Sequence, residues 1–308
     1  MEQLSLTLSI VIVSFNTKEK LRKCLSCLDV ARHQVIVVDN DSDDGSQDQV
    51  KTEFPRVHLI ENGENIGFGR ANNVGIDHST GELILFLNSD AYVMPGAIDK
   101  LIEVFGDPKV VAAGPKLLNT DGSLQESVAG RLTLTNVLLE QTYLDTIARK
   151  VNKGYWRTNH VQDQPITEVD QVMGACIVIR SSLKLRFDER FFLYCEDTEL
   201  CRRIAEKGKI VYVRDAEVTH ELGSSSVDSR WKSVARYNLG KELYFNIHHG
   251  SLAAAICWWL DRLGAFLRLL AGLVLAPVKL SGREKVKIFS RVLLARTATI
   301  IPQEHRSQ

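Results

Sequence analysis

Glycine is missing from the start of this 308-residue chain, where the first glycine is Gly45. Dinucleotide-binding folds place G-x-G-x-x-G at the turn after the first strand, and P-loops also need glycines there. The first apolar run ends instead in Ser14-Phe15-Asn16. The Gly67-Phe68-Gly69 triplet has Asn72 where a third glycine would stand. A nicotinamide, flavin or P-loop enzyme is therefore disfavoured, and side chains must bind any nucleotide.

Cysteine is also scarce, since the chain has six in total. Cys24 and Cys27 form a C-x-x-C on a helical pattern, but no second pair completes a four-ligand zinc site. We expect both cysteines to be packing residues rather than metal ligands. The N-terminus lacks a basic region followed by an apolar stretch and a cleavage site. These absences predict a reducing, cytoplasmic location.

No run of about 20 uninterrupted apolar residues is present, as a spanning helix would need. The most apolar segment, residues 251–280, carries Trp258 and Trp259 near its start, and Arg262 interrupts its apolar face. We expect an amphipathic helix or shallow hairpin lying in the membrane plane, with tryptophan near the headgroups. A helix packed on the rest of the protein is the alternative. A narrow stripe of its helical wheel holds Asp261, Gly264, Arg268, Gly272 and Lys279.

The formal net charge is zero, but the charge is unevenly distributed. Residues 227–308 contain thirteen Lys and Arg against five Asp and Glu, so residues 1–226 carry an equal acidic excess. An acidic body with a basic tail predicts a domain boundary after residue 226. We expect the tail, residues 227–308, to associate with a membrane surface. No nucleic acid partner is expected. The sequence does not decide whether the chain forms a homo-oligomer.

Strand-like and helical patterns alternate along the first half of the chain. Apolar runs at 8–15, 35–39, 57–61 and 83–87 are separated by helical patterns, which predicts βαβ units and an α/β fold with a mostly parallel sheet. The hydrophobic content of 44% and charged content of 25% suit such a globular protein. Later segments are expected to be one helix (132–151), a loop (158–169) and two strands (172–179 and 210–213).

Three aspartates stand out by their places in this pattern. Asp39 and Asp90 follow buried strands, and open α/β sheets bind ligands at the carboxyl ends of strands. Asp197 lies where a helix begins. Three carboxylates converging on one crevice suit a site that holds a divalent cation, a diphosphate and a hydroxyl to be deprotonated.

Purely structural roles are the alternative for each of these residues. Asp39 and Asp90 could cap helices that follow their strands. Glu196, Asp197 and Glu199 could be first-turn acids that complement a helix dipole. A histidine after the last strand, His220, could be an ordinary loop residue. The order of these residues beside the matching elements favours the functional interpretation.

Five motifs and a later histidine together resemble a family-2 glycosyltransferase, and most closely its rhamnosyltransferase-like branch. The motifs are VIVSFN, VVDNDSDDGS, NIGFGRANNVGI, LFLNSDAYVMPGAI and FFLYCEDTELCRRIAEKG. The resemblance spans about residues 8–225. It implies a nucleotide-diphosphate-sugar-binding fold of the GT-A type, a divalent cation, and inversion at the sugar carbon.

The resemblance also implies roles for individual residues. Asp39 matches the acid that binds the nucleotide base. Asn88-Ser89-Asp90 occupies the D-x-D position, which leaves Asp90 as the carboxylate metal ligand and Asn88 as a candidate for the ribose. Asp197 matches the catalytic base, with Glu196 as the neighbour that could take its role. His220 matches a second metal ligand. Residues beside the nucleotide or facing the donor are Ser14, Asn16, Asn65 and Arg70.

These roles predict an inverting, metal-dependent glycosyltransferase. We expect it to move a deoxyhexose such as rhamnose from a dTDP- or UDP-sugar to a glycan or polyprenyl-diphosphate-linked acceptor in cell-surface polysaccharide synthesis. Carboxylate oxygen suits Mg²⁺ or Mn²⁺, and an imidazole ligand favours Mn²⁺ somewhat. A sugar-1-phosphate nucleotidyltransferase is one alternative, although SFNTKEK lacks that class's glycine-rich loop. A non-catalytic, membrane-docked scaffold is the other.

Overall fold

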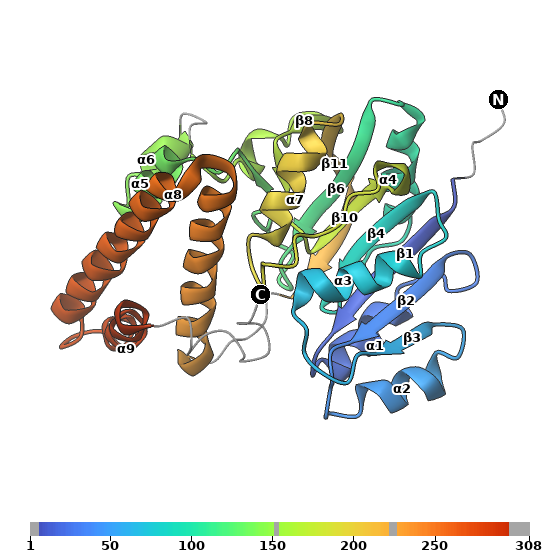
Figure 1. Cartoon of the computed structure of the whole chain (residues 1–308), viewed down its shortest axis with the longest axis horizontal. Coiled ribbons are helices and arrows are strands. Elements are labelled where there is room, and N and C mark those ends of the chain that lie inside the picture. The colour runs from blue at the N-terminus through green and yellow to red at the C-terminus, as the bar shows by residue number, and fades with distance from the viewer. Residues whose placement is uncertain (1–5, 151–153, 222–226, 296–308) are drawn as a thin grey trace. The chain divides into compact units, whose positions relative to one another are not determined.

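The computed structural model describes residues 6–150, 154–221 and 227–295, which form two compact units (Figure 1). The α/β unit comprises Met1–Arg131, Trp156–Glu189 and Asp197–Gly223. The helical unit comprises Leu132–Tyr155, Arg190–Glu196 and Ser224–Gln308. The functional boundary after residue 226 stays a prediction. Two segments that precede this boundary, Leu132–Tyr155 and Arg190–Glu196, nevertheless pack with the C-terminal helices.

The sheet of the α/β unit has nine strands within the described residues, in the order β3-β2-β1-β4-β10-β6-β11-β5, with β8 paired to β11. The strands are β1 (Leu8–Ser14), β2 (Gln34–Asp39), β3 (His58–Glu61), β4 (Leu83–Asn88), β5 (Ala91–Val93), β6 (Val110–Leu118), β8 (Ile166–Val169), β10 (Cys176–Arg180) and β11 (Lys209–His220). Strands β3, β2, β1 and β4 are parallel to one another, as predicted. Strand β10 runs antiparallel to β4 and β6, so the sheet is mixed.

Two expectations for the middle of the chain need correction. The strand expected over 172–179 is divided into β9 (Gln171–Val172) and β10, and β9 pairs with β7 (Val128–Ala129) in a separate ribbon. The segment 158–169 is not only loop, because it contains a 3-10 turn, η2 (Thr158–His160), and the edge strand β8. Strand β8 is short, polar and half exposed, so its sequence lacks the apolar run of a buried strand.

Helices cover both faces of the sheet, as the strand–helix alternation predicts. Buried residues of α1 (Lys18–Ser26), α2 (Ser46–Glu53) and α4 (Ala97–Glu103), and of the 3-10 turn η1 (Val104–Gly106), pack with one face. Buried residues of α3 (Phe68–Asp77) and α7 (Glu196–Ala205) pack with the other, near the turn η3 (Ser181–Leu183). Because each strand alternates its side chains between these layers, the central strands β1, β2 and β4 are largely apolar on both faces.

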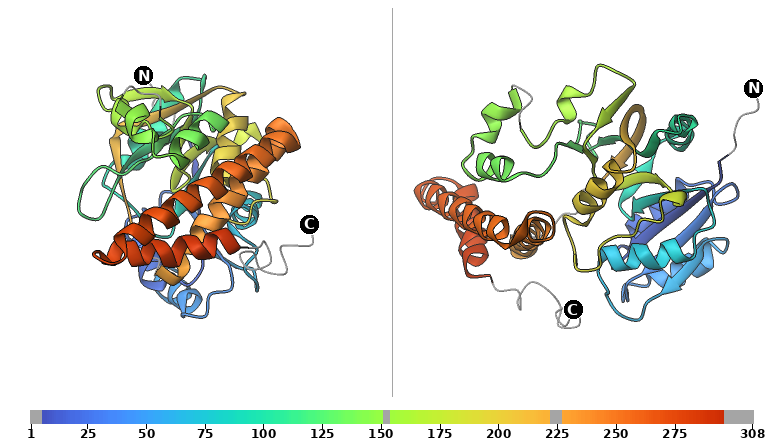
Figure 2. Two further views of the ribbon diagram at one scale, coloured as in Figure 1. Left: turned by 90° about the vertical axis from the view of Figure 1, so that its left-hand side faces the viewer. Right: turned by 45° about the horizontal axis from the view of Figure 1, so that its top comes forward.

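The helical unit contains α5 (Leu134–Gln141), α6 (Asp145–Lys150), α8 (Val227–Leu275) and α9 (Leu280–Leu294). The single helix expected over 132–151 is broken between α5 and α6, where Tyr143 has a φ of 62°. Helix α8 is interrupted at Gly250, which has a φ of 82°. Glycine adopts this left-handed conformation easily because it has no Cβ. Figure 2 shows the two halves of α8 with α9 beside them.

The polar stripe of residues 261–272 faces the interior of the helical unit. Asp261 is 2% exposed and accepts a hydrogen bond from the ammonium of Lys241, 2.6 Å away. At Gly264 and Gly272, an added Cβ would meet Gln141 of α5 and the backbone of α9. The two glycines therefore allow α5 and α9 to approach α8 closely, and Asp261 is paired with Lys241 inside the helical unit.

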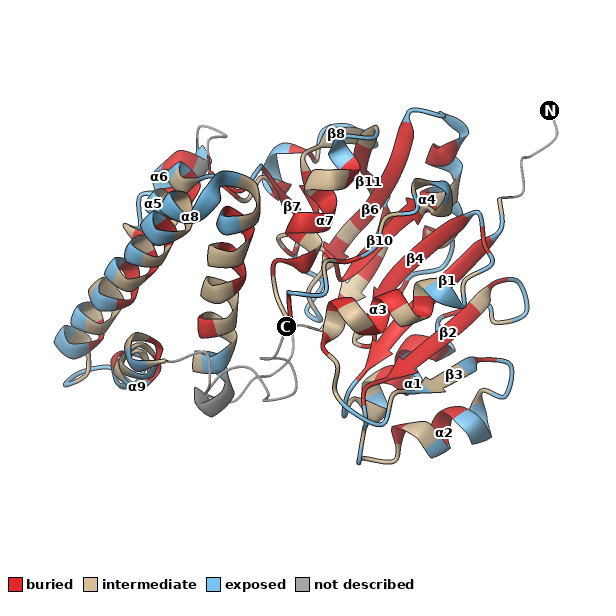
Figure 3. Ribbon diagram, in the orientation of Figure 1, coloured by how far each residue is buried: buried red, intermediate tan, exposed pale blue. Residues whose placement is uncertain are grey.

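The apolar side of the second half of α8 faces outward instead. Figure 3 shows exposed positions recurring along this helix. The exposed row consists of Leu252, Ile256, Trp259, Leu263, Phe266, Leu270, Leu273 and Val274, and Val278 and Leu280 follow it. We call these residues the apolar row. In agreement with the sequence, no helix of the described residues is long and apolar enough to cross a membrane.

Candidate functional site

The predicted nucleotide-side residues meet at the carboxyl edge of the parallel strands. Ser14 pairs with Asp39 across β1 and β2, and Val13 pairs with Asn88 across β1 and β4. These pairings place Ser14, Asp39 and Asn88 side by side. The sheet register therefore confirms that these three residues come together, as the strand–helix alternation predicts.

Asp39 organises the loop that follows β2. Its Oδ1 accepts hydrogen bonds from the backbone N–H of Ser42 and the amide of Gln47, and its Oδ2 accepts one from the Ser42 hydroxyl at 2.7 Å. Asp39 is not a helix cap, because Gly45 occupies the N-cap position of α2. The carboxylate is 1% exposed, and its Oδ2 takes only one donor among the described residues.

Asn16 ties the loop after β1 to the loop after β2. It lies in the left-handed region, with a φ of 54°. Its backbone N–H donates to the Ser42 hydroxyl, and its Oδ1 accepts from the Asp43 N–H, both at 2.9 Å. The Ser14 hydroxyl lies 3.1 Å from that of Thr17. Ser14 and Asn16 thus shape the backbone around the site.

Asn65 and Arg70 belong to the segment that enters α3. The Oδ1 of Asn65 accepts a hydrogen bond from the N–H of Gly67, which has a φ of 85° at the N-cap of α3. Arg70 is half-buried, and its guanidinium lies 3.5 Å from the carboxylate of Glu189. Asn65 therefore holds a turn, whereas Arg70 makes one long ion pair among the described residues, which leaves other guanidinium N–H groups available.

Asp90 and His220 form the predicted metal pair. Strand β5 runs antiparallel to β11, so His220 pairs with Ala91 beside Asp90. The Nε2 of His220 lies 3.3 Å from the Oδ1 of Asp90, and also 3.3 Å from the Nδ2 of Asn88. Since β5 follows Asp90 directly, this residue does not cap a helix. His220 is 6% exposed and ends a strand, so it is not a solvated loop histidine.

Asn88 contributes an oxygen to the same place. Its Oδ1 is buried and accepts no hydrogen bond from the described residues. A buried acceptor without a donor is costly in an empty site, and a cation or a hydroxyl would satisfy it. No group of three or more His, Cys, Asp or Glu gathers as a metal centre within the described part of the chain. Two protein ligands, with the remaining positions left to a diphosphate, fit a substrate-bridging cation.

Asp197 is linked to the same edge through the backbone. Its Oδ2 accepts a hydrogen bond from the Gly174 N–H at 2.9 Å, and its Oδ1 accepts one from the Thr198 N–H at 2.8 Å. The carbonyl of Ala175, next to Gly174, accepts from the Asn88 N–H. Burial raises the pKa of the Asp197 carboxyl, and the two backbone donors oppose that rise. A buried carboxylate with a raised pKa is suited to take a proton.

The other acids of the same helix have different surroundings. Glu199 is 2% exposed and forms an ion pair with Arg203, with Arg203 Nε 2.7 Å from its Oε1. The structural alternative therefore holds for Glu199. Glu196 is 5% exposed and begins α7. Asp197 is bonded to the backbone that leads to Asn88.

Sequence reasoning missed Gln125. Its amide contacts both the ring and the carbonyl of His220, and it lies in an irregular segment 95 residues away along the chain. No periodicity or motif marks that segment. A buried glutamine after β6 is visible only once the chain has folded.

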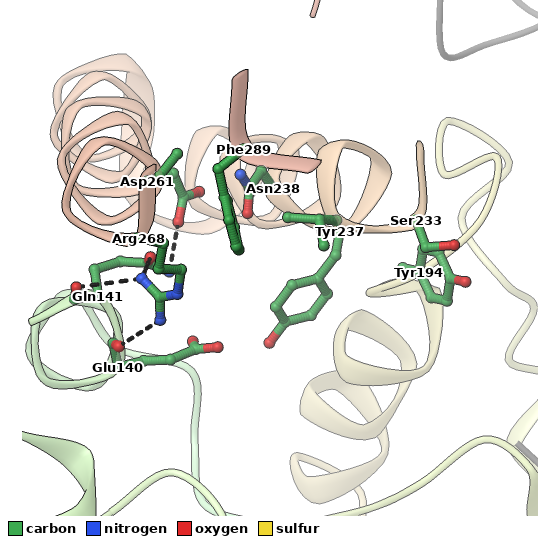
Figure 4. Close-up of a pocket in the computed structure, with 11 residues that line it drawn as sticks. Glu140, Gln141, Tyr194, Ser233, Tyr237, Asn238, Asp261, Arg268 and Phe289 are labelled. Atoms are coloured by element: carbon green, nitrogen blue, oxygen red, sulfur yellow. Dashed lines mark hydrogen bonds between the residues drawn. The ribbon is translucent and has the colours of Figure 1, made fainter. Parts of the chain in front are cut away.

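A separate cavity of about 380 Å³ lies within the helical unit and contains none of the predicted site residues. Figure 4 shows Arg268 pointing toward Gln141 and Glu140, whose carbonyl oxygens accept from it at 3.3 and 3.0 Å. Gln141 also donates to Asp261 at 3.1 Å. The cavity is lined by Glu140, Gln141, Tyr194, Ser233, Val234, Tyr237, Asn238, Asp261, Ala265, Arg268 and Phe289. These contacts join α5 to the second half of α8.

A mixed α/β sheet that gathers Asp39, Asn88 and Asp90 at one edge is the arrangement expected of a GT-A glycosyltransferase. The chain belongs to glycosyl transferase family 2, whose model matches residues 9–184. This membership confirms the resemblance seen in the motifs. It selects glycosyl transfer over the nucleotidyltransferase and scaffold alternatives.

Curated relatives extend the similarity beyond the family model. The chain is 27% identical over 304 residues to N-acetylglucosaminyl-diphospho-decaprenol L-rhamnosyltransferase of Mycobacterium tuberculosis, covering 91% of this chain and 97% of that protein. It is 26% identical over 224 residues to dTDP-rhamnosyl transferase RfbF of Shigella flexneri, covering 70% of each. The first match extends beyond the residues that the family model covers, since it takes in 91% of this chain.

Solved structures share the fold at low sequence identity. Mannosyltransferase PcManGT from Pyrobaculum calidifontis, in complex with GDP-Man and Mn²⁺, is 13% identical with a TM-score of 0.54. That match covers 94% of this chain and 85% of the mannosyltransferase. GalNAc-T7 with UDP, GalNAc and Mn²⁺ has a TM-score of 0.53 at 14% identity, covering 95% of this chain and 57% of that protein. These similarities confirm the predicted GT-A fold.

Proposed function

We propose that this enzyme transfers L-rhamnose from a dTDP-sugar to a polyprenyl-diphosphate-linked sugar in cell-surface polysaccharide synthesis. The observation that carries the proposal is the match to the mycobacterial rhamnosyltransferase, which extends over 91% of this chain and 97% of that protein. The second rhamnosyltransferase relative supports the same donor. If the sugar were another deoxyhexose, or the donor a UDP-sugar, the reaction would still be a glycosyl transfer of the same class.

The nucleotide would bind along the edge formed by β1 and β2. In this proposal Asp39 accepts from the base through its Oδ2, which takes one donor from the described residues. Ser14 and Asn16 line the nucleotide through the loop that they shape. Asn65 and Arg70 face the donor from the entry of α3, and the part-exposed guanidinium of Arg70 suits a diphosphate oxygen.

Asp90 and His220 would hold a Mn²⁺ or Mg²⁺ ion near the diphosphate of the donor. The fit rests on the Asp90 carboxylate and the Nε2 of His220, which lie 3.3 Å apart, and on the buried, unsatisfied Oδ1 of Asn88 nearby. Such an ion stabilises the negative charge that develops on the leaving diphosphate. The imidazole ligand favours Mn²⁺ over Mg²⁺. Asn88 would then contact the donor ribose or a ligand of the ion.

Inversion would follow from a single displacement with one base. The acceptor hydroxyl oxygen bonds to the anomeric carbon while the bond from that carbon to the diphosphate oxygen breaks. The hydroxyl proton passes to the Asp197 carboxylate, and the nucleoside diphosphate leaves with the electron pair. The raised pKa of Asp197 supports its role as that proton acceptor. Glu196 is the neighbouring acid that would take over if Asp197 proved dispensable.

The membrane would be reached through the helical unit, at the inner face of the cell membrane. The apolar row leaves Trp259 68% and Val274 78% exposed on one side of α8. From Leu252 to Leu273 its residues are spaced alternately four and three apart, as in a coiled-coil seam. The flanking positions, however, include Leu260 and Leu267, where charged residues normally stand. This wide apolar face, with the basic helix α9 next to it in sequence, supports lipid as its partner.

The reaction can be tested with purified full-length protein, a synthetic polyprenyl-diphosphate N-acetylglucosamine, and dTDP-L-rhamnose or UDP-sugars with Mn²⁺. We expect release of dTDP together with a glycosylated lipid, whose anomeric configuration by NMR is opposite to that of the donor. An Asp197→Asn variant serves as the control. Retention of configuration would overturn the single displacement, and turnover with UDP-sugars alone would overturn the donor assignment.

A further inference from the structure

Gln125 makes three hydrogen bonds in a buried position beside His220. The side chain is 4% exposed. Its Nε2 donates to the Oδ1 of Asn119 at 2.8 Å and to the backbone carbonyl of His220 at 3.0 Å. Its Oε1 lies 2.8 Å from the Nδ1 of His220. One amide thus contacts both the main chain and the ring of a predicted metal ligand.

The two acceptors of Nε2 determine which way the amide points. Both are oxygens of carbonyl type, so the NH₂ group must face them. The remaining atom, Oε1, has no hydrogen and can only accept. A hydrogen bond at 2.8 Å therefore requires the hydrogen to be on Nδ1 of the ring. In neutral His220, Nε2 consequently carries a lone pair.

This lone pair faces the groups of the candidate metal site. Nε2 lies 3.3 Å from the Asp90 carboxylate, and neither atom has a hydrogen to offer the other. The Asn88 amide, also at 3.3 Å, is the donor that Nε2 has among the described residues. Two acceptors held this close are repulsive until a cation lies between them.

We propose that Gln125 is a positioning residue of the metal site, which sets His220 as the Nδ1–H tautomer and aims Nε2 at the ion. This inference rests on the proposed metal role of Asp90 and His220. A metal-binding histidine is commonly oriented by a hydrogen bond at its other nitrogen, and losing that bond lowers metal affinity by about 10–100-fold. Gln125 supplies that bond here.

The turn that carries Gln125 is held by backbone hydrogen bonds that do not involve the Gln125 side chain. The backbone N–H of Asn119 donates to Ser123 at 2.8 Å, and the N–H of Gln125 donates to Leu117 at 2.9 Å. A bridge also joins Leu118 to Leu124. A substitution at Gln125 is therefore expected to change the ring of His220 rather than unfold the segment.

The tautomer can be measured directly in the metal-free protein. Long-range ¹⁵N–¹H NMR at pH 8 distinguishes protonated from unprotonated ring nitrogens, and a His220→Gln variant assigns the signals. We expect Nδ1–H for His220 in the wild type and a shift toward Nε2–H in Gln125→Met, because methionine keeps the length but removes the acceptor. An Nε2–H ring in the wild type, or an unchanged ring in the variant, would overturn the proposal.

Metal binding provides the second readout. Free Mn²⁺, followed by EPR during titration of the protein with dTDP, should show affinity falling by about 10–100-fold in Gln125→Met. Gln125→Glu keeps an oxygen facing Nδ1 but loses the two hydrogen bonds that Nε2 donates, so its ring should remain Nδ1–H in the NMR experiment. Ser123→Ala removes a side-chain bond to Asn119 in the same turn and is the matched control.

The two readouts separate this inference from the metal assignment. A tautomer that switches while Mn²⁺ affinity is unchanged would overturn the positioning role of Gln125. If Asp90→Ala and His220→Ala also leave Mn²⁺ binding unchanged, the metal site itself is wrong, although the NMR result on the ring still stands. Loss of affinity in Ser123→Ala equal to that in Gln125→Met would assign the effect to the turn as a whole.

Discussion

The Asp197 carboxylate accepts a hydrogen bond from the backbone N–H of Gly174, and an added Cβ at Gly174 would lie 2.8 Å from the Asp197 Cβ. The candidate base is thus held against a residue that has no side chain. Gly174 follows β9 and precedes β10, next to the residue that bonds Asn88. The position of the base is therefore coupled to the edge of the sheet where the donor would bind.

Asp197→Asn keeps the shape of the side chain but removes its ability to take a proton. We expect transfer to fall by roughly 10²-fold or more while donor binding survives. In the wild type, the rate should fall as the pH drops through the raised pKa of this carboxyl, because the base becomes protonated. Steady-state kinetics and dTDP titration measure the two effects. Near-normal turnover would shift the role to Glu196.

Gly174→Ala should displace the base without removing it. The new methyl group would collide with Asp197, and a small misplacement at a reacting centre lowers the rate by about 10²-fold. We expect kcat to fall while the donor Kd changes little. Gly106→Ala is the matched control, because an added Cβ there has nothing within 4 Å. Equal losses in both variants would point to general destabilisation.

Asp90→Ala and His220→Ala should each weaken donor binding by about tenfold or more when Mn²⁺ is present, and by much less without it. The reason is that the ion, rather than the side chains themselves, would contact the diphosphate. Calorimetric titration with and without Mn²⁺ separates the two. Full activity in excess chelator would remove the metal from the mechanism.

The stability of the helical unit should be sensitive to loss of either partner in the ion pair between Lys241 and Asp261. Both side chains are nearly inaccessible to solvent, so Asp261→Asn leaves a buried ammonium without its carboxylate. We expect the free energy of unfolding to fall by about 3–5 kcal/mol. The double variant Lys241→Met with Asp261→Leu should recover most of that loss. Tryptophan fluorescence during urea unfolding is suitable, because Trp231, Trp258 and Trp259 all lie in this unit.

Charge on the apolar row should release the enzyme from membranes. Trp259→Glu with Phe266→Glu is expected to abolish sedimentation with anionic liposomes and to slow transfer to a lipid-linked acceptor more than donor hydrolysis. Ile166→Glu, at a similarly exposed apolar residue of β8, is the control. Truncation after Asn246 should act in the same direction. A wild-type dimer that ignores liposomes and becomes monomeric in the double variant would show instead that a second copy covers the row.

Strands β1, β2 and β4 could be predicted from the sequence because buried parallel strands are continuous apolar runs. The positions of Asp39 and Asp90 after such runs were enough to place them at one edge, since all parallel strands end on the same side. The motifs likewise pointed to His220, which lies 3.3 Å from Asp90, and to Asp197, which is bonded to the backbone of Gly174. Local pattern and chain order carry this part of the information.

Tertiary structure alone decided the contacts between distant, unpatterned segments. Gln125 reaches His220 from an irregular stretch, and Gln141 reaches Asp261 from another helix, so no local signal marks either pair. The sequence also did not determine whether the polar stripe of α8 faces solvent or the interior of the helical unit. A helical wheel shows that Asp261 and Arg268 share a face, but whether that face meets water or a buried lysine depends on the partners that folding brings to it.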